Sequence, residues 1–312
     1  MPAFFSRYRR HLALVLTLLP GIAAAQLFSS APSVVRQRPC FDEPAAFKSE
    51  KLQRLEERLA CYAFTYQVDG FNVPGYAVIP KSTAQKKLPV LIYNRGGNSS
   101  LGQITLENVA RIHMDWADQG FIIVASQYRG TKLPGVQTEG RDEYGGSDVA
   151  DVMALLPIID GIPEADANRI GMFGISRGSI MTYRMVARTR RIKAIAIWGG
   201  ISDMVTELPR RPEMERAMVN YIPGFAANRD RLLKDRSVIY WMDKLDPALP
   251  ILLLHGDADK NVAVENASVM AEKLKERNQP HKLVIYPGGD HGLTKYRSQA
   301  REEILGWFKQ YL

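Results

Sequence analysis

The sequence has few residues of the kinds that hold metal ions or cross-link small domains. Only two of its 312 residues are cysteine and five are histidine. These counts exclude a disulfide-dense scaffold and a four-thiolate zinc site. No cluster of His, Cys, Asp and Glu has metal-ligand spacing, and no G-x-x-x-x-G-K-[ST] nucleotide loop occurs. We therefore expect neither a metal nor another cofactor.

The sequence also has few long apolar runs, and the longest of them lies close to the N-terminus. Arg7, Arg9 and Arg10 precede an apolar run at 12–19, and Ala23-Ala24-Ala25 follows it. A positive start, a short apolar run and an A-x-A exit are the parts of a secretory signal. The run is too short to span a bilayer comfortably, although a membrane anchor is the alternative. We predict cleavage after Ala25, export to the periplasm or the medium, and no stable membrane insertion afterwards.

Repeats and strong charge asymmetry are absent as well. No period of 20–50 residues recurs, which argues against a solenoid or propeller. With 46% apolar and 24% charged residues, the composition is that of a globular protein. The net charge of +8 falls to +5 once the three signal arginines are removed. Apart from short clusters such as Arg188-Arg190-Arg191 the basic residues are spread out, so we expect no nucleic-acid partner.

The two cysteines, Cys40 and Cys61, would meet an oxidising compartment after export. Residues 49–60 are predicted to form a charged helix, which would hold the two thiols apart. A bridge therefore requires the chain before Ser49 to fold back. Two alternatives stay open: a disulfide, or two unpaired buried thiols.

Residues 62–312 show the pattern of an α/β domain, after a signal at 1–25 and an N-terminal lead-in and helix at 26–61. Two β-prone runs at 62–68 and 73–79, split by Asp69-Gly70, predict an antiparallel hairpin. Short apolar runs then alternate with amphipathic stretches, which predicts a mostly parallel sheet covered by helices on both faces. The predicted strands are 90–93, 121–125, 170–173, 194–198, 251–255 and 282–286. The predicted helices are 106–118, 144–159, 178–189, 263–277 and 294–312.

Residues 200–248 interrupt this alternation of strands and helices. They are predicted to form a helical excursion over the edge where such sheets bind ligands.

One strand-to-helix junction carries a nucleophile motif. Gly174-Ile175-Ser176-Arg177-Gly178 follows the strand at 170–173 and opens a helical pattern. This is the context of a nucleophile elbow, in which a tight turn lifts the serine hydroxyl above the sheet. The helix that follows aims N–H groups and its positive dipole end at the same point. The alternative without a catalytic role is a strand-to-helix turn in which the serine caps the helix N-terminus.

A serine nucleophile needs a base and an orienting acid. His291 is the only histidine that lies in a Gly-rich loop after a strand and downstream of acidic residues. His113 is expected in packing or at the surface, and His255 is expected to organise the acid loop. Asp257 and Asp259 both follow the strand at 251–255, and two residues of separation should point them in different directions. The order Ser176, Asp259, His291 is that of α/β-hydrolases.

The reaction also needs donors for the oxyanion. One would be the N–H of Arg177, which follows the serine. The other is expected from Gly96 or Gly97, because paired glycines after the strand at 90–93 permit close approach to a substrate carbonyl. The choice between the two glycines stays open.

Together these motifs resemble the prolyl oligopeptidase-type serine peptidases, over residues 62–312. The resemblance lies in six segments that occur in the family's order: the glycine pair in 91–98, Gln127-Tyr128-Arg129-Gly130, the acidic stretch 143–151, the elbow, and the acid and histidine loops 255–262 and 289–292. The resemblance implies an α/β-hydrolase fold, places the acid at Asp259 and leaves Asp257 to shape its loop. Two residues depart from the family pattern. Arg95 stands where a histidine is common, and Arg177 stands where many members have tyrosine.

The resemblance implies a serine hydrolase, for which we favour cleavage of short peptides through an acyl-enzyme. About 36 residues separate the predicted cleavage from Tyr62, too few for the propeller of larger members. An esterase acting on a small ester with the same triad is the alternative, and a non-catalytic binding protein on this fold is the third. The side-chain roles of Arg95, Arg129 and Arg177 stay open between substrate binding and structural ion pairs. The sequence gives no indication of oligomeric state.

Overall fold

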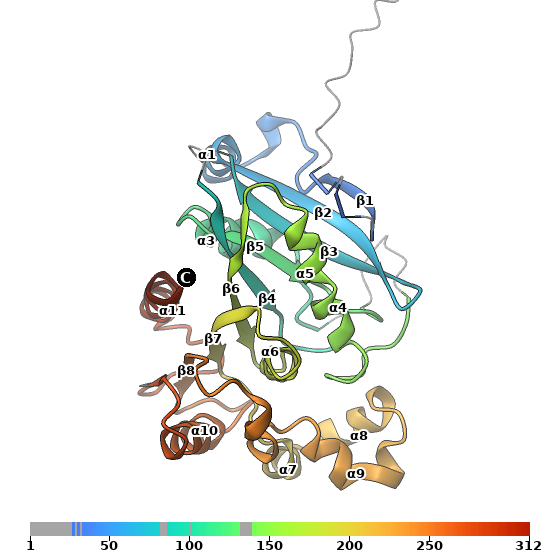
Figure 1. The fold of residues 1–312 in the computed structure, drawn as a ribbon, viewed down its shortest axis with the longest axis vertical. Coiled ribbons are helices and arrows are strands. Elements are labelled where there is room, and N and C mark those ends of the chain that lie inside the picture. The colour runs from blue at the N-terminus through green and yellow to red at the C-terminus, as the bar shows by residue number, and fades with distance from the viewer. Residues whose placement is uncertain (1–26, 29, 32, 82–85, 100, 132–138) are drawn as a thin grey trace, which may run out of the picture.

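A nine-stranded sheet runs through the part of the chain that the structure describes (Figure 1). The structure is a computed structural model, and it describes residues 27–312 except 29, 32, 82–85, 100 and 132–138. The predicted signal segment and its cleavage site lie outside the described residues. The strand order is β1-β2-β3-β5-β4-β6-β7-β8-β9. The strands are β1 (Val34–Pro39), β2 (Leu59–Val68), β3 (Phe71–Pro80), β4 (Leu88–Asn94), β5 (Ile122–Ser126), β6 (Ala165–Ile175), β7 (Ile192–Trp198), β8 (Ile251–Gly256) and β9 (His281–Tyr286).

The direction of pairing divides the sheet as the sequence predicts. The strands β1, β2, β3 and β5 pair antiparallel in that order, whereas β5, β4, β6, β7, β8 and β9 pair parallel. All six predicted strands after the hairpin are present. Because the carboxyl ends of the parallel strands meet at one edge, the loops that follow them meet there too.

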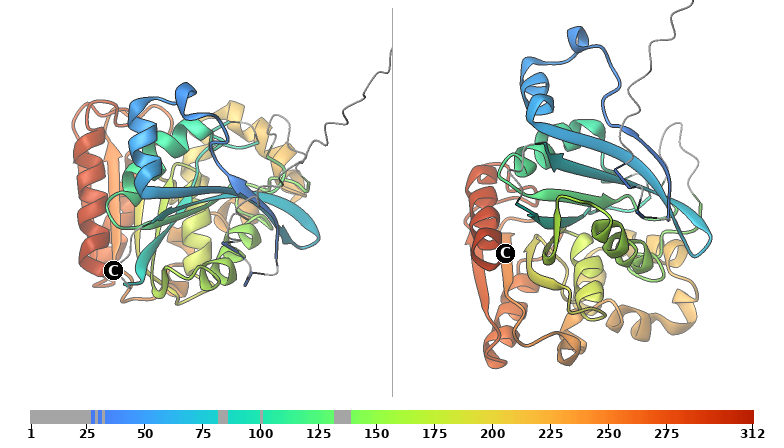
Figure 2. Two further views of the ribbon diagram at one scale, coloured as in Figure 1. Left: turned by 90° about the horizontal axis from the view of Figure 1, so that it is seen from above. Right: turned by 45° about the horizontal axis from the view of Figure 1, so that its top comes forward.

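Helices cover both faces of the sheet (Figure 2). On one face lie α4 (Val149–Met153), α5 (Leu155–Asp160), α6 (Gly178–Val186) and α10 (Glu265–Glu276). On the other lie α1 (Glu50–Arg58), α2 (Leu106–Asn108), a π-helical turn (Val109–His113), α3 (Met114–Ala117) and α11 (Arg297–Tyr311). No helix among the described residues is both long and apolar enough to cross a bilayer.

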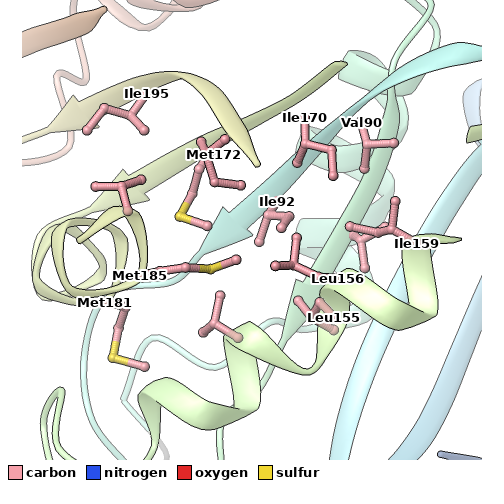
Figure 3. Packing of buried hydrophobic residues seen from close by; sticks show 14 of the residues in the cluster. Val90, Ile92, Leu155, Leu156, Ile159, Ile170, Met172, Met181, Met185 and Ile195 are labelled. Carbon is pink, nitrogen blue, oxygen red and sulfur yellow. The ribbon is translucent and has the colours of Figure 1, made fainter. Parts of the chain in front are cut away.

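The core between the sheet and α5 and α6 shows why these strands read as continuous apolar runs. Ile92 of β4 and Met172 of β6 point at Leu156 of α5 and Met185 of α6, and all four are buried (Figure 3). Each large apolar side chain buried in this way contributes about 1.5–3 kcal/mol. This packing fixes α6, and therefore the turn before it, against the sheet.

The helix predicted from residue 144 begins later, with α4 at Val149. Tyr144 has a φ of 54° and Gly145 a φ of 85°, so neither residue is helical. Asp142 and Asp148 instead turn their carboxylates toward a buried arginine, Arg177. A long-range ion pair thus overrides the local helical pattern.

The predicted excursion at 200–248 is present as short helices around their own small core. They are α7 (Met204–Glu207), α8 (Pro212–Tyr221) and α9 (Phe225–Lys234), with 3-10 turns at Leu208–Arg210, Val238–Tyr240 and Met242–Lys244. Their apolar side chains pack on Tyr144, Ile180 and Val262. The excursion therefore lies beside the elbow helix α6 and the loop after β8.

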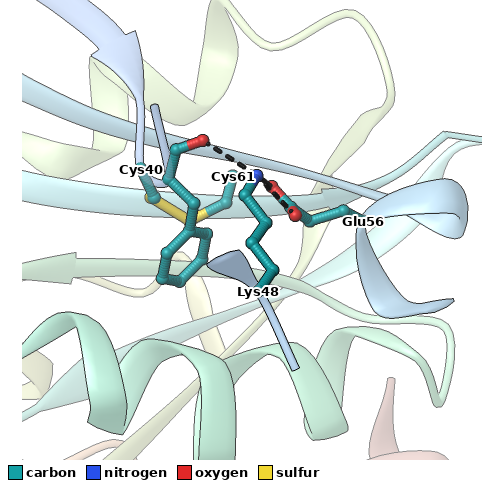
Figure 4. Close-up of a disulfide and its surroundings, with 5 residues drawn as sticks. Cys40, Lys48, Glu56 and Cys61 are labelled. Atoms are coloured by element: carbon teal, nitrogen blue, oxygen red, sulfur yellow. Dashed lines mark hydrogen bonds and ion pairs between the residues drawn. A yellow bond between two sulfur atoms is a disulfide. The ribbon is translucent and has the colours of Figure 1, made fainter. Parts of the chain in front are cut away.

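The lead-in segment folds back along β2 and brings the two cysteines together. Strand β1, which the sequence did not reveal, pairs antiparallel with β2 and places Pro39 opposite Tyr62. Cys40 and Cys61 form a disulfide with a Cα–Cα distance of 5.3 Å, which settles the alternative left open above (Figure 4). The predicted helix ends at Arg58 in the structure, so Cys61 lies on a strand. Nearby, Lys48 bonds both Glu56 and the carbonyl of Phe41.

Reduction of this disulfide should lower stability without abolishing the fold. The bridge closes a loop with a sequence separation of 21, for which loop-closure entropy gives about 3 kcal/mol. We expect dithiothreitol to lower the thermal midpoint of the wild type, and the double substitution Cys40→Ala/Cys61→Ala to lower it similarly. The double variant should not respond to dithiothreitol. An unchanged wild-type midpoint after reduction would contradict the bridge.

Candidate active site

Ser176 stands at the tight turn between β6 and α6. Its φ of 53° lies in the left-handed region, which a non-glycine residue adopts at a cost. The two glycines of the motif are required by space. A Cβ on Gly174 would lie 2.5 Å from Thr182 Oγ1, and one on Gly178 would lie 2.1 Å from the carbonyl oxygen of Asn94. The turn is therefore the strained elbow that the sequence predicts.

His291 and Asp259 form a hydrogen-bonded pair in two loops at the same sheet edge. His291 Nδ1 lies 2.7 Å from Asp259 Oδ2, and the carboxylate is fully buried. The other oxygen, Oδ1, accepts N–H bonds from Asn261 and Val262. Burial alone would raise the pKa of Asp259, but the bonds from His255 and His291 hold that pKa well below its ordinary value. Asp259 is therefore charged at neutral pH and fixes the imidazole.

His255 and Asp257 shape the acid loop, as expected. His255 is buried, and its Nε2 lies 3.0 Å from the carbonyl oxygen of Val262 and 3.2 Å from Asp259 Oδ2. Asp257 points elsewhere and accepts a bond from the N–H of Gly288. Of the two candidate acids, only Asp259 bonds the histidine.

Trp198 and Gly199, at the end of β7, connect the elbow to the histidine loop. The Trp198 carbonyl oxygen accepts a hydrogen bond from the Ser176 N–H at 2.9 Å. The indole Nε1 of the same residue donates to the His291 carbonyl at 3.0 Å. A Cβ on Gly199 would lie 3.1 Å from His291 Nδ1 and 3.3 Å from Asp259 Oδ2. Only a glycine lets the chain pass this close to the pair. Sequence reasoning missed both residues, although a tryptophan-glycine-glycine run directly after a strand was a usable signal.

Several polar groups around Ser176 remain available for a substrate. Within the described part of the chain, neither Ser176 Oγ nor His291 Nε2 makes a hydrogen bond, and catalytic bonds are often long before substrate binds. The N–H groups of Gly96, Gly97 and Arg177 likewise donate to no described residue. Gly96 lies against the serine, since a Cβ there would be 3.1 Å from Ser176 Cβ. Of these donors, Gly96 and Arg177 thus lie next to Ser176.

The Arg177 side chain is structural and is not offered to a substrate. Its guanidinium is buried and bonds Asp142 at 2.7 Å, Asp148 at 2.5 Å and the carbonyl of Gly97 at 3.0 Å. The group also lies 5.0 Å from the ring centres of both Tyr128 and Tyr144. One side chain therefore ties the elbow to the glycine loop.

Arg95 supports the same loop without a carboxylate partner. It is buried, and no described carboxylate lies within ion-pairing distance. Its guanidinium donates to the carbonyls of Gly96, Leu101 and Gln127 and to Thr131 Oγ1. Burial and the neighbouring Arg177 lower the pKa of Arg95 to about 10. Both arginines thus hold carbonyl groups of the glycine loop.

The remaining singled-out residues lie away from the serine. Arg129 pairs with buried Asp151 of α4 at 2.6 Å and with Asp69 at 2.8 Å, so it joins α4 to the turn between β2 and β3. His113 is buried edge-on against Tyr93, and burial lowers its pKa to about 4. Its expected packing role is therefore confirmed.

Comparison of the sequence with models of known protein families identifies one family. The model of the prolyl oligopeptidase family matches residues 109–312, which is more than half of the chain. The chain belongs to the prolyl oligopeptidase family. It is therefore a serine hydrolase of the peptidase type, and the predicted α/β-hydrolase fold is confirmed.

Individual relatives agree with this membership. The uncharacterized peptidase YtmA of Bacillus subtilis is 27% identical over 255 residues, which cover 81% of this chain and 95% of YtmA. Dipeptidyl-peptidase 5 of Porphyromonas gingivalis is 24% identical, over 78% of this chain and 36% of its own length. Among solved structures, a Pyrococcus horikoshii acylaminoacyl peptidase superposes with a TM-score of 0.71 at 18% identity, over 85% of this chain and 44% of its own. The chain thus spans less than half of the two larger proteins.

Removing the Arg177 guanidinium should be costly. In Arg177→Met, Asp142 and Asp148 would keep buried charges with no cation between them, and breaking such a pair costs about 3–5 kcal/mol. We expect a large fall in the urea midpoint, and a smaller one in Arg177→Lys, which keeps the charge but has no fork. Wild-type stability in Arg177→Met would show that the two carboxylates do not need the cation.

Proposed function

We propose that this chain is an exported serine peptidase that cleaves short peptides, with Ser176, His291 and Asp259 as its triad. The observation that carries the proposal is the 2.7 Å bond between His291 Nδ1 and a buried Asp259, in a loop that Trp198 connects to the strained serine. The serine hydroxyl makes no hydrogen bond to any described residue. Membership of a peptidase family supports the same reaction class.

In the proposed reaction His291 moves one proton back and forth. Nε2 takes the proton of Ser176 Oγ as the oxygen attacks the substrate carbonyl carbon, and the imidazolium is stabilised by the Asp259 charge. Nε2 then gives the proton to the leaving amine as the carbon–nitrogen bond breaks, which leaves an acyl-enzyme. Water attacks next with His291 again as base, and the acid product leaves as the serine regains its proton.

The carbonyl oxygen becomes negative in each tetrahedral intermediate and needs N–H donors. The unbonded N–H of Arg177 supplies one. Gly96 is the favoured source of the second because it lies closer to Ser176 than Gly97 does. The Gly96 N–H shares its peptide plane with the Arg95 carbonyl, which accepts a bond from the Tyr128 hydroxyl at 3.2 Å. Arg95 and Arg177 hold the carbonyls of Gly96 and Gly97 and so fix the next part of the loop.

A small cavity beside the elbow suggests which side chain precedes the cut. Tyr144, Ile201, Met204, Leu208 and Met214 give it apolar walls, and Glu207, Arg211 and Asn261 complete the lining. Its volume is about 20 Å³, little more than one water requires. A small apolar side chain therefore fits best at this position.

Substitution of the triad should remove activity and leave the fold. We expect Ser176→Ala to lower kcat by several orders of magnitude and Asp259→Asn to lower it by about 10⁴. Asp257→Asn is the matched control, because that carboxylate lies two residues away and, among the described residues, accepts a bond from the Gly288 N–H alone. Turnover on a reporter substrate and circular dichroism would be measured together. Wild-type rates in folded Ser176→Ala would refute the nucleophile.

A peptide digest separates the candidate functions. Wild type and Ser176→Ala would be incubated with a diverse mixture of short peptides and read by mass spectrometry. We expect cuts only by wild type, mainly after small apolar residues. A folded protein that reacts with a fluorophosphonate but cuts no peptide would favour the esterase alternative. Failure to react with the fluorophosphonate would favour a binding protein.

Export is supported by the N-terminal sequence pattern and by the Cys40–Cys61 bridge, since disulfides persist in oxidising compartments. We expect the protein purified from its own cells to begin at Gln26. N-terminal sequencing of the full-length gene product measures this directly. An intact N-terminus on protein recovered from the cytoplasm would refute export.

A further inference from the structure

A second cavity, of about 210 Å³, lies at the opposite end of α6 from the nucleophile. Arg184 and Ala187 of the last turn and Arg188 just beyond form one side, and Asp235, Trp241 and Lys244 of the excursion form the other. Ser176 precedes the first turn of the same helix. This cavity is therefore separate from the candidate active site.

Its net charge is positive, because three cations and one carboxylate, that of Asp235, line it. Within the described chain, Arg184, Arg188 and Lys244 have no carboxylate within 4 Å. The carboxylate of Asp235, the acidic residue of the lining, bonds Arg231 instead. Close neighbours outside the cavity differ in this respect, because Arg191 pairs with Asp160 at 2.5 Å. Like charges gathered in one hollow repel one another, and a bound anion relieves that repulsion.

Arg184 is the most constrained of the three cations. Its Nη1 donates to the carbonyl of Asp235 at 2.5 Å, while its buried Nε has no hydrogen-bond partner among the described residues. Burial and the neighbouring Arg188 lower the pKa of Arg184. A guanidinium with an unused N–H is a ready donor to an oxyanion, because its fork matches two oxygens.

The Trp241 ring gives the cavity an apolar surface that is fixed in position. Trp241 is half-buried, and its Nε1 donates to the Lys234 carbonyl at 3.1 Å. Ala187 adds a second apolar surface. An occupant can therefore be anionic at one end and apolar at the other.

We propose that this cavity binds a small phosphate monoester, with its dianionic group on Arg184, Arg188 and Lys244 and its organic body against Trp241. Phosphate carries two charges near neutral pH and three strong acceptor oxygens, which match three cations. The source of the phosphate is a small molecule with an apolar group, or free inorganic phosphate, and the test distinguishes them.

Titration calorimetry at 0.15 M salt tests the site with three probes: phenyl phosphate, inorganic phosphate and neutral benzyl alcohol. We expect one saturable site for phenyl phosphate, weaker binding of inorganic phosphate and none of benzyl alcohol. Arg188→Gln/Lys244→Gln should weaken phenyl phosphate at least tenfold. Trp241→Leu should weaken phenyl phosphate and leave inorganic phosphate unchanged.

Arg191→Gln is the matched control, since it removes a nearby charge that is already paired and should change the affinity less than twofold. Arg188 and Lys244 are exposed and lie outside the triad, so peptide cleavage by their variant reports that it is folded. No saturable binding to wild type, or an equal loss in Arg191→Gln, would overturn the site. Equal affinity for phenyl phosphate and inorganic phosphate would contradict the proposed contact between an organic group and Trp241. It would identify free phosphate as the ligand.

Discussion

The buried guanidinium of Arg177 is the interaction on which the arrangement of the site depends. It connects three segments that are far apart in the sequence: the elbow, the glycine loop at Gly97 and the 142–148 stretch. Each of these segments contains a residue with positive φ, and such conformations persist only where the surroundings hold them. A pair of buried carboxylates around one cation supplies that hold, at the cost of desolvating three charges.

The rest of the site follows from close approach of backbone to backbone. A Cβ on Gly256 would lie 2.1 Å from the Gly289 carbonyl oxygen, so the acid loop and the histidine loop pack without side chains between them. Gly199 makes the same allowance beneath the imidazole. Because glycines occur where the strands end, the loops that follow can pack closely. Their polar groups therefore come within hydrogen-bonding distance of one another.

The sequence predicted the features that repeat locally and missed those made by distant partners. Alternating apolar runs located β4 to β9 and the strand-to-helix turn at Ser176. The Gly-rich loop after a strand pointed to His291, and the family resemblance pointed to Asp259, which bonds His291 in the structure. Strand β1 was missed because Val34–Pro39 is largely exposed and ends in proline, which hides any alternation. The roles of Arg95 and Arg177 could not be predicted, because the partners of Arg177 lie 29 and 35 residues away. Helix α4 begins later than predicted for the same reason, because Asp142 and Asp148 pair with the distant Arg177.

The position of β4 in the sheet has a consequence for how the molecule is divided. The family match begins at residue 109, after β1 to β4, and contains all three residues of the proposed triad. Yet β4 lies between β5 and β6, in the middle of the parallel strands. A fragment limited to the matched segment would leave a gap in the centre of its own sheet and would lack the glycine loop that follows β4. The matched segment and the strands before it thus form one sheet, and the proposed reaction centre draws on both.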